Sequence, residues 1–307
     1  MTPLLTVNCR RTEHMKAFQV EFTATKQGLL REALQHYGIS KRTLASVKYG
    51  GGHLLVNGSE VTVRHPLEAG DAVTVIFPKE IQGKGLTAEA GPLAIVYEDD
   101  ALLIVEKPPG QNTIPSREQP YGSLANVVAG HFERHGIPST LHIATRLDKD
   151  TSGLVCIAKN RHIHHLLSVQ QQEKRMNRRY EAFVHGEVAS QKALITAPIG
   201  RKGTSIIERE VREDGKFAET EMELIQSMAG ISHVRLKLNT GRTHQIRVHL
   251  AHVGHPLLGD DLYSGERKLI SRQALHCTEL QLDHPVSGER LAFSSALAKD
   301  MRALLQS

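Results

Sequence analysis

The chain has 307 residues, which is longer than one typical domain and predicts two. Its apolar content of 40% is enough for ordinary packed cores, so the composition excludes wholesale disorder. The 38 basic and 33 acidic residues give a net charge of +5, to which the 18 histidines add as the pH falls. This modest charge is compatible with an anionic partner such as nucleic acid but does not by itself identify one.

The three cysteines, Cys9, Cys156 and Cys277, are few and widely spaced. They form no C-x-x-C pair, which excludes a redox or zinc motif of that kind. The N-terminus carries basic residues but no apolar segment typical of an export signal, and no stretch approaches 18 consecutive apolar residues. We therefore expect a cytoplasmic protein that is neither exported nor embedded in a membrane.

The first 80 residues have the pattern of a small α+β domain behind an N-terminal extension. Alternation over 18–22 predicts an edge strand, and apolar spacing from residue 28 to about 47 predicts two short helices. Gly38 ends the first of these helices and Ser40 can cap the second. Asn57-Gly58, between two apolar runs, is a strong signal for a β-hairpin turn.

The second predicted helix carries three cations, Lys41, Arg42 and Lys48. Two small helices followed by a hairpin resemble the RNA-binding domain first seen in ribosomal protein S4, over about residues 26–78. This resemblance implies that the three cations contact RNA. The alternative is a generic small α+β domain whose basic helix is simply solvated.

A Gly- and Lys-bearing linker at 81–92 separates this region from a larger domain, 93–307. The larger domain begins with two apolar strands and a helix, and a compact apolar run later reads as a buried strand. Thr243 can cap a helix with Ile246, Leu250 and Val253 facing inward. The expected strands are 93–97, 102–106, 154–158, 180–184 and 234–238, and the expected helices include 124–134, one capped by Asn160, and 296–305.

A charged cluster, Arg146-Leu147-Asp148 with Asp150 nearby, lies on the loop before the buried strand. A rigid sheet edge is a common place for catalytic groups. A calcium loop starting at Asp148 is excluded, because its twelfth position is Lys159 where a bidentate glutamate is required. A glycosidase-like pair of Asp148 and Asp150 lacks a defined separation, and the chain has no tryptophan to provide a sugar platform.

Four histidines, His244, His249, His252 and His255, lie close together in the sequence. They do not share one helix face, and 244, 249 and 252 contain no i, i+4 pair of the kind that binds zinc. Core and surface histidines are the favoured interpretation, so we expect no metal site.

Five blocks in order resemble an RluA-type RNA pseudouridine synthase over about residues 90–300. This resemblance implies an α+β fold with an antiparallel mixed sheet, and the S4-like domain is a common companion in the family. The blocks are Lys107-Pro108-x-Gly110, Arg146-Leu147-Asp148 with Thr151-Ser152-Gly153-Leu154, Tyr180-x-Ala182-x-Val184-x-Gly186, Gly241-Arg242-Thr243-His244-Gln245-Ile246-Arg247, and the closing Leu275-His276, His284-Pro285 and Gly288-Glu289.

The resemblance assigns a role to each of several residues. Asp148 would be the catalytic aspartate, Arg242 the basic residue that pairs with it, and Tyr180 the tyrosine that stacks on the target base. Arg146 would fill the gap left by the flipped uridine, and Lys107 joins it as a candidate substrate-binding residue. A neighbouring guanidinium favours the ionised form of a carboxylate, which suits a nucleophile or base.

The isomerisation is redox-neutral, so the resemblance implies no metal or nucleotide cofactor. Large-subunit ribosomal RNA is the favoured substrate, with transfer RNA as the alternative, and a monomer is the default. Thr145 stands where the family usually has histidine, which keeps a second hypothesis open. In that hypothesis the chain is a catalytically silent RNA-binding factor for ribosome assembly.

Overall fold

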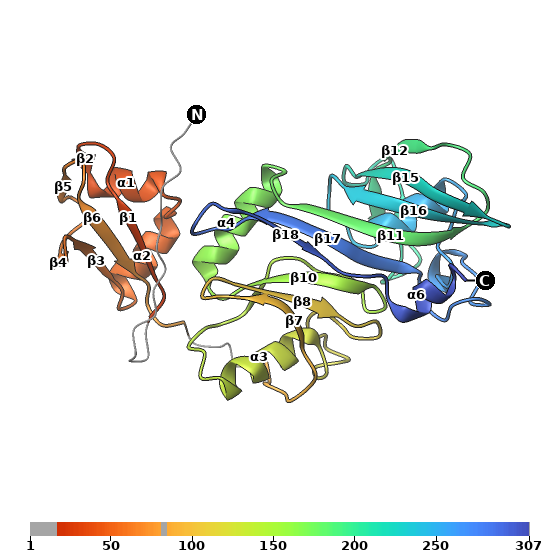
Figure 1. The fold of residues 1–307 in the computed structure, drawn as a ribbon, viewed down its shortest axis with the longest axis horizontal. Coiled ribbons are helices and arrows are strands. Elements are labelled where there is room, and N and C mark those ends of the chain that lie inside the picture. The colour runs from red at the N-terminus through yellow and green to blue at the C-terminus, as the bar shows by residue number, and fades with distance from the viewer. Residues whose placement is uncertain (1–16, 81–84, 307) are drawn as a thin grey trace.

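The computed structural model describes residues 17–80 and 85–306, which form two regions with separate sheets and separate cores (Figure 1). Cys9, the rest of the N-terminal extension and linker residues 81–84 lie outside the described residues. The described part of the chain contains no helix long and apolar enough to cross a membrane.

The N-terminal region is a four-stranded sheet in the order β1-β6-β3-β4, with two short helices packed beside it (Figure 1). Asn57 and Gly58 both have positive φ, 51° and 81°, and so form the predicted hairpin turn between β3 and β4. The Ser40 hydroxyl accepts a hydrogen bond from the Thr43 amide and caps α2 as expected. The elements are β1 (Gln19–Thr23), β2 (Gly28–Leu29), α1 (Leu30–His36), α2 (Lys41–Tyr49), β3 (His53–Val56), β4 (Ser59–Glu60), β5 (Pro66–Leu67) and β6 (Ala72–Ile76).

The larger region is organised on a ten-stranded mixed sheet, with a main strand order of β12-β15-β16-β11-β17-β10-β8-β7. β9 pairs with β10, and β18 pairs with β17. The α+β class with an antiparallel mixed sheet is therefore confirmed. The strands are β7 (Ala94–Glu98), β8 (Leu102–Lys107), β9 (His142–Ile143), β10 (Ser152–Ala158), β11 (Asn177–His185), β12 (Lys192–Thr196), β15 (Glu219–Met228), β16 (Ile231–Leu238), β17 (Leu275–Asp283) and β18 (Arg290–Ser294).

Helices and a small hairpin complete this region. The Asn160 side chain caps α4 by accepting from the Ile163 amide, as the sequence predicts. Figure 1 shows α4 on the side of the large sheet that faces the N-terminal region. The remaining elements are α3 (Leu124–Arg134), α4 (Arg161–Gln172), β13 (Ile199–Arg201), β14 (Arg209–Val211), α5 (Gln245–His252), the 3-10 helix η1 (Asp261–Tyr263) and α6 (Lys299–Ala303).

Three local expectations were wrong. The helix α5 begins after His244 rather than at a Thr243 cap, and Val253 is 40% exposed instead of facing inward. The final helix is only five residues long, Lys299–Ala303. Strands β12 and β15 were not anticipated, because alternating charged residues and exposed apolar side chains such as Leu194 hide the strand pattern there.

The two regions meet at α4 and β9. The Phe77 ring stacks on the His162 ring, with their centroids 4.9 Å apart. Glu80 accepts hydrogen bonds at 2.8 Å from the backbone amide of Arg161, and pairs at the same distance with Nε2 of His142. These hydrogen bonds and the ion pair to His142 hold the Glu80 carboxylate in its charged form and lower its pKa, although burial acts the other way.

Strand β10 lies inside the large sheet, between β17 and β8, and all seven of its residues are buried. It pairs with β8 in antiparallel fashion and with the start of β17 in parallel, where Gly153 lies opposite Cys277. Gly153 has a φ of 110°, and a Cβ atom added there would lie 2.3 Å from the carbonyl oxygen of Cys277. Only glycine allows this close approach of the two strands.

Replacing Gly153 with alanine should therefore destabilise the fold by roughly 3 kcal/mol, because the backbone clash adds to the cost of the left-handed conformation. Urea unfolding of the two proteins measures the difference. Gly203→Ala is the matched control, since an added Cβ there meets no atom within 4 Å. The control should change stability by no more than about 0.5 kcal/mol; equal losses in both variants would contradict this role of Gly153.

Candidate active site

Asp148 lies on the loop that leads into β10, and its side chain is 29% exposed. Its backbone carbonyl accepts a hydrogen bond from the Thr151 amide at 3.1 Å, which closes a tight turn. The carboxylate is thus held at the edge of a buried strand while solvent can still reach it.

Side chains from other elements hold this loop through its backbone carbonyls. Thr113 Oγ1 donates to the Leu147 carbonyl at 2.7 Å. Lys107 Nζ donates to the Lys149 carbonyl at 2.9 Å, and Arg272 Nη1 donates to the Asp150 carbonyl at 2.9 Å. Because these donors come from the end of β8 with the loop after it and from the distant Arg272, the position of Asp148 depends on the assembled fold and not on the local sequence alone.

Lys107 has a different place from the one that the sequence suggested. It is fully buried, and its ammonium group donates to the carbonyls of Pro108, Gln111 and Lys149 at 2.8–2.9 Å. Burial lowers its pKa to about 7, while the charge of Asp150 acts in the opposite direction. With all three donors engaged inside the protein, Lys107 anchors the loop, and the expected substrate contact is corrected to a positioning role.

Arg247 is the guanidinium that lies beside Asp148. It forms a bidentate pair with Asp260, with both N–O distances 2.7 Å, and its Nη1 lies 3.3 Å from Oδ2 of Asp148. Burial opposes its charge, but the hydrogen bonds and charge of Asp260, together with the charge of Asp148, raise the pKa of Arg247 above its ordinary value. Its guanidinium also lies over the Tyr263 ring, 4.9 Å from the ring centre.

Arg242, the expected partner of Asp148, lies elsewhere. It is exposed, and its Nε donates to the backbone carbonyl of Phe217 at 2.9 Å. The pairing was misassigned because α5 begins three residues later than Arg242, which directs Arg247 rather than Arg242 toward the loop. The sequence did contain a signal for Arg247, which lies between the apolar residues Ile246 and Val248. A charged residue in such a buried position needs a partner of opposite charge.

Tyr180 lies in β11, and only 3% of it is exposed. Burial raises its pKa, and the charge of Asp148 adds to this effect while that of Arg178 opposes it. Its hydroxyl oxygen accepts a hydrogen bond from Arg178 Nη1 at 3.3 Å. The phenol therefore stays protonated at neutral pH and lies within electrostatic reach of Asp148.

Arg146 and Thr145 point to opposite environments although they are adjacent. Arg146 is exposed and has no hydrogen-bond or ion-pair partner in residues 17–80 and 85–306. Thr145 is buried, and its hydroxyl accepts a hydrogen bond from the Cys156 amide at 2.9 Å. Thr145 thus bonds to the second half of β10, whereas Arg146 is available for an external ligand.

His244 is a member of this site that sequence reasoning treated only as a core or surface histidine. Its Nε2 lies 3.9 Å from Oδ2 of Asp148, and its Nδ1 lies 2.8 Å from the Tyr263 hydroxyl. Burial lowers its pKa, although the charge of Asp148 acts the other way. The other histidines of the run lie elsewhere: His249 bonds to Thr220 and to the Ala197 carbonyl. No cluster of metal-binding side chains occurs among the described residues.

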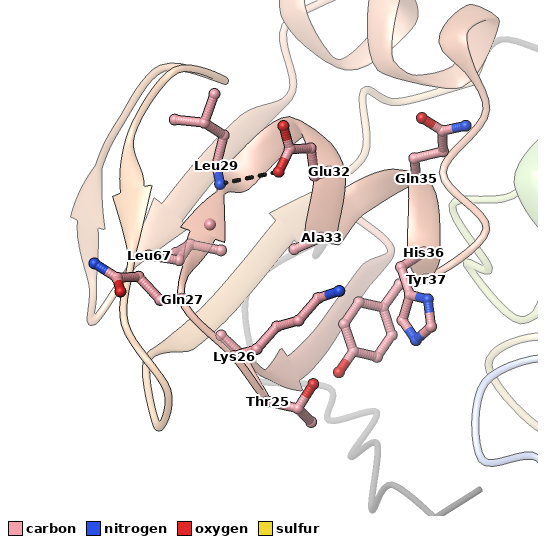
Figure 2. A pocket seen from close by; sticks show the side chains of 12 residues that line it. Thr25, Lys26, Gln27, Leu29, Glu32, Ala33, Gln35, His36, Tyr37 and Leu67 are labelled. Carbon is pink, nitrogen blue, oxygen red and sulfur yellow. Dashed lines mark hydrogen bonds between the residues drawn. The ribbon is translucent and has the colours of Figure 1, made fainter.

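The N-terminal region has a cavity of its own, about 410 Å³ in volume, between the loop after β1 and helix α1. Figure 2 shows the Lys26 side chain extending along it toward Tyr37, and Leu29 donating its amide hydrogen to Glu32. All its lining residues belong to 24–37 and Leu67, so it does not include Asp148 or its neighbours.

The cations of α2 lie on the surface of the same region. Lys41, Arg42 and Lys48 are all exposed, and Lys48 Nζ lies 5.0 Å from the centre of the Tyr49 ring. Tyr49 is itself 81% exposed. An exposed aromatic ring beside cations is a combination found on surfaces that bind nucleic acids.

Comparisons with known proteins identify the family. Residues 101–252 match the model of a family described as RNA pseudouridylate synthase. The uncharacterized RNA pseudouridine synthase YjbO of Bacillus subtilis is 46% identical over 277 residues, which cover 90% of this chain and 98% of that protein. The chain belongs to the RNA pseudouridine synthase family. This confirms the RluA-type resemblance of the larger region.

Other relatives agree with this family. The ribosomal large subunit pseudouridine synthase D of Pseudomonas aeruginosa is 34% identical to this synthase over 304 residues, covering 94% of each chain. Among solved structures, human RNA pseudouridylate synthase domain containing 1 is 25% identical with a TM-score of 0.55, covering 71% of this chain and 96% of that one. Human RNA pseudouridylate synthase domain containing 4, at 21% identity and a TM-score of 0.57, shares the fold.

The positioning role of Lys107 in this synthase can be tested with Lys107→Met. Removing the ammonium group leaves three buried carbonyls without a donor, so the free energy of unfolding should fall by about 3 kcal/mol in urea titrations. The salt dependence of RNA binding should stay unchanged, because a buried amine neutralises no phosphate. Lys149→Met, an exposed lysine of the same loop, is the control and should leave stability unchanged.

Proposed function

We propose that this synthase isomerises specific uridines to pseudouridine in structured RNA, with Asp148 as the catalytic aspartate. The observation that carries the proposal is the partly exposed Asp148 carboxylate beside a buried arginine that Asp260 holds in place. A cation fixed in this way orients the carboxylate, and a nucleophile or base has to be held in a defined position. The reaction breaks the bond from C1′ to N1 and forms one from C1′ to C5; N1 gains a proton and C5 loses one.

The surrounding residues fit complementary roles in this proposal. Tyr180, a buried phenol near Asp148, would stack on the target base and assist proton transfer at C5. Arg146, exposed and without an internal partner, would enter the RNA where the uridine is extruded. Extruding a base costs on the order of a few kcal/mol, and a stacked, phosphate-binding guanidinium offsets part of that cost. Arg247 takes the role first expected of Arg242.

We infer that the substrate is large-subunit ribosomal RNA. The name of the Pseudomonas aeruginosa relative, a ribosomal large subunit pseudouridine synthase, supports this class. Transfer RNA remains the alternative substrate, and a catalytically silent assembly factor is the alternative function. The placement of Arg247 beside the Asp148 carboxylate favours an active enzyme. In this proposal the protein acts as a cytoplasmic monomer.

We further propose that residues 1–80 form an S4-like RNA-binding domain, 81–92 a linker and 93–307 the catalytic domain. The separate sheet and core of the N-terminal region support such a division. The exposed cations of α2 and the neighbouring Tyr49 support an RNA-binding role for that domain.

Asp148→Asn should abolish pseudouridine formation while RNA affinity changes little, because the amide cannot act as a nucleophile or base. Pseudouridine mapping of total RNA from cells that lack the protein, complemented with the native chain or the variant, provides the measurement. Asp150→Asn is the matched control, with the same charge change two residues away, and should restore the missing sites. Full restoration by Asp148→Asn would contradict the assignment, and loss of no site in the deletion strain would favour the assembly factor.

The combined substitution of Lys41, Arg42 and Lys48 by glutamine should weaken RNA binding most at low salt. If each cation neutralises one phosphate, the slope of log affinity against log salt should become shallower by about 2 units. Titrations of RNA binding at several salt concentrations measure this slope.

The control removes the same charge from three exposed lysines outside the N-terminal region, Lys192, Lys268 and Lys299. It should leave the slope close to that of the native protein. Equal changes in the two triple variants would show only a general effect of net charge.

A further inference from the structure

His244 has an unusual backbone conformation next to Asp148. It precedes the first residue of α5 with a φ of 56°, in the left-handed region that non-glycine residues rarely adopt. Such strain persists only where the surrounding structure enforces it. It brings the imidazole, 12% exposed, to the same oxygen of Asp148 that Arg247 approaches.

Tyr263 determines which imidazole nitrogen carries the proton. Its hydroxyl oxygen accepts a hydrogen bond from the Arg209 amide at 2.9 Å, and the hydroxyl lies 2.8 Å from Nδ1 of His244. With that oxygen engaged as an acceptor, the hydroxyl proton is directed to Nδ1. A neutral His244 then carries its own proton on Nε2, the nitrogen that faces Asp148. Burial lowers the pKa of His244 and supports this neutral form.

Nε2 of His244 and the carboxylate of Asp148 face one another without a direct contact. The distance of 3.9 Å from Nε2 to Oδ2 of Asp148 is too long for a direct hydrogen bond. A small group that both accepts and donates a hydrogen bond would satisfy the two atoms together. A hydroxyl has that capacity.

We propose that His244 and Asp148 together bind the 2′-hydroxyl of the target uridine, which accepts from Nε2 of His244 and donates to Oδ2 of Asp148. This inference rests on the proposed function, in which Asp148 acts at the ribose and therefore lies beside C1′ and C2′. The 2′-hydroxyl is both donor and acceptor, and it is the group that distinguishes RNA from DNA. His244 thus becomes a substrate-binding residue that selects ribose at the flipped nucleotide.

The experiment uses the full-length protein and a short RNA containing the mapped target site, with either uridine or 2′-deoxyuridine at that position. Single-turnover rates are measured for the native enzyme, His244→Asn and Tyr263→Phe. Asparagine tolerates the left-handed backbone but is too short to reach the hydroxyl. His252→Asn, at an exposed histidine that ends α5, is the matched control.

For the native enzyme and the His252 control, 2′-deoxy substitution should slow the reaction by at least roughly tenfold, the value of one hydrogen bond. His244→Asn should slow the reaction on the all-ribose RNA by a similar factor but lose most of the further effect of 2′-deoxy substitution. Removing the hydroxyl also changes the sugar itself, so the 2′-deoxy effect on one enzyme alone does not test the contact. The test is the coupling, which is the 2′-deoxy effect on the rate of the native enzyme divided by that of the variant. Tyr263→Phe removes the hydroxyl that fixes the proton of His244 on Nε2, so the proton can move to Nδ1. This variant should show a smaller coupling of the same sign.

An equal 2′-deoxy penalty in the native enzyme and in both variants overturns the inference while leaving the proposed function intact. Thermal unfolding shows whether each variant is folded. If His244→Asn is unfolded, the loss of the 2′-deoxy effect in Tyr263→Phe alone tests the inference. A native enzyme that forms no pseudouridine in any cellular RNA contradicts the proposed function, and the role of His244 with it.

Discussion

The ion pair between Arg247 and Asp260 is the interaction on which the geometry of the site depends. Asp260 is 1% exposed and accepts from Arg247 through both oxygens, so neither side chain can turn away without leaving a buried charge unpaired. Two carboxylates share this one guanidinium, and of the two only Asp148 is partly open to solvent. The structure therefore keeps one carboxylate buried as the support for Arg247 and presents the other at the surface of the site.

A second constraint acts on the backbone around Asp148. The carbonyls of residues 147, 149 and 150 each accept from a side chain of another element. Arg272, one of those donors, is itself held by Asp300 at 2.6 and 2.9 Å. Three backbone carbonyls of the loop are thus paired, and its shape is determined by residues far away in the sequence. Such support keeps a functional group in position without a local helix or strand to fix it.

Sequence reasoning succeeded for features whose structure is determined by neighbouring residues in the chain. The Asn57-Gly58 turn and the Ser40 and Asn160 caps each depend on neighbouring residues, and the structure shows all of them. It failed at Arg242, because the start of α5 is set by tertiary hydrogen bonds. The Gln245 side chain accepts from the Arg242 amide and the Thr240 hydroxyl and donates to Thr220 on β15. The buried anchoring by Lys107 and the contact of His244 with Tyr263 likewise join segments whose proximity no local pattern reveals.

The strands β10 and β17 lie side by side although Ser152 and His276, which share a hydrogen bond of 2.8 Å, are 124 residues apart. During synthesis the N-terminal region emerges first and β10 follows, long before its partner strand exists. Pairing over such a separation is slow because the intervening chain must be ordered first. An unfinished chain that already includes Asp148 and Arg247 still lacks Arg272 and Asp300. The Asp148 loop can therefore be locked only after the last strand and helix have been synthesised, so the C-terminal residues complete the site that begins more than a hundred residues earlier.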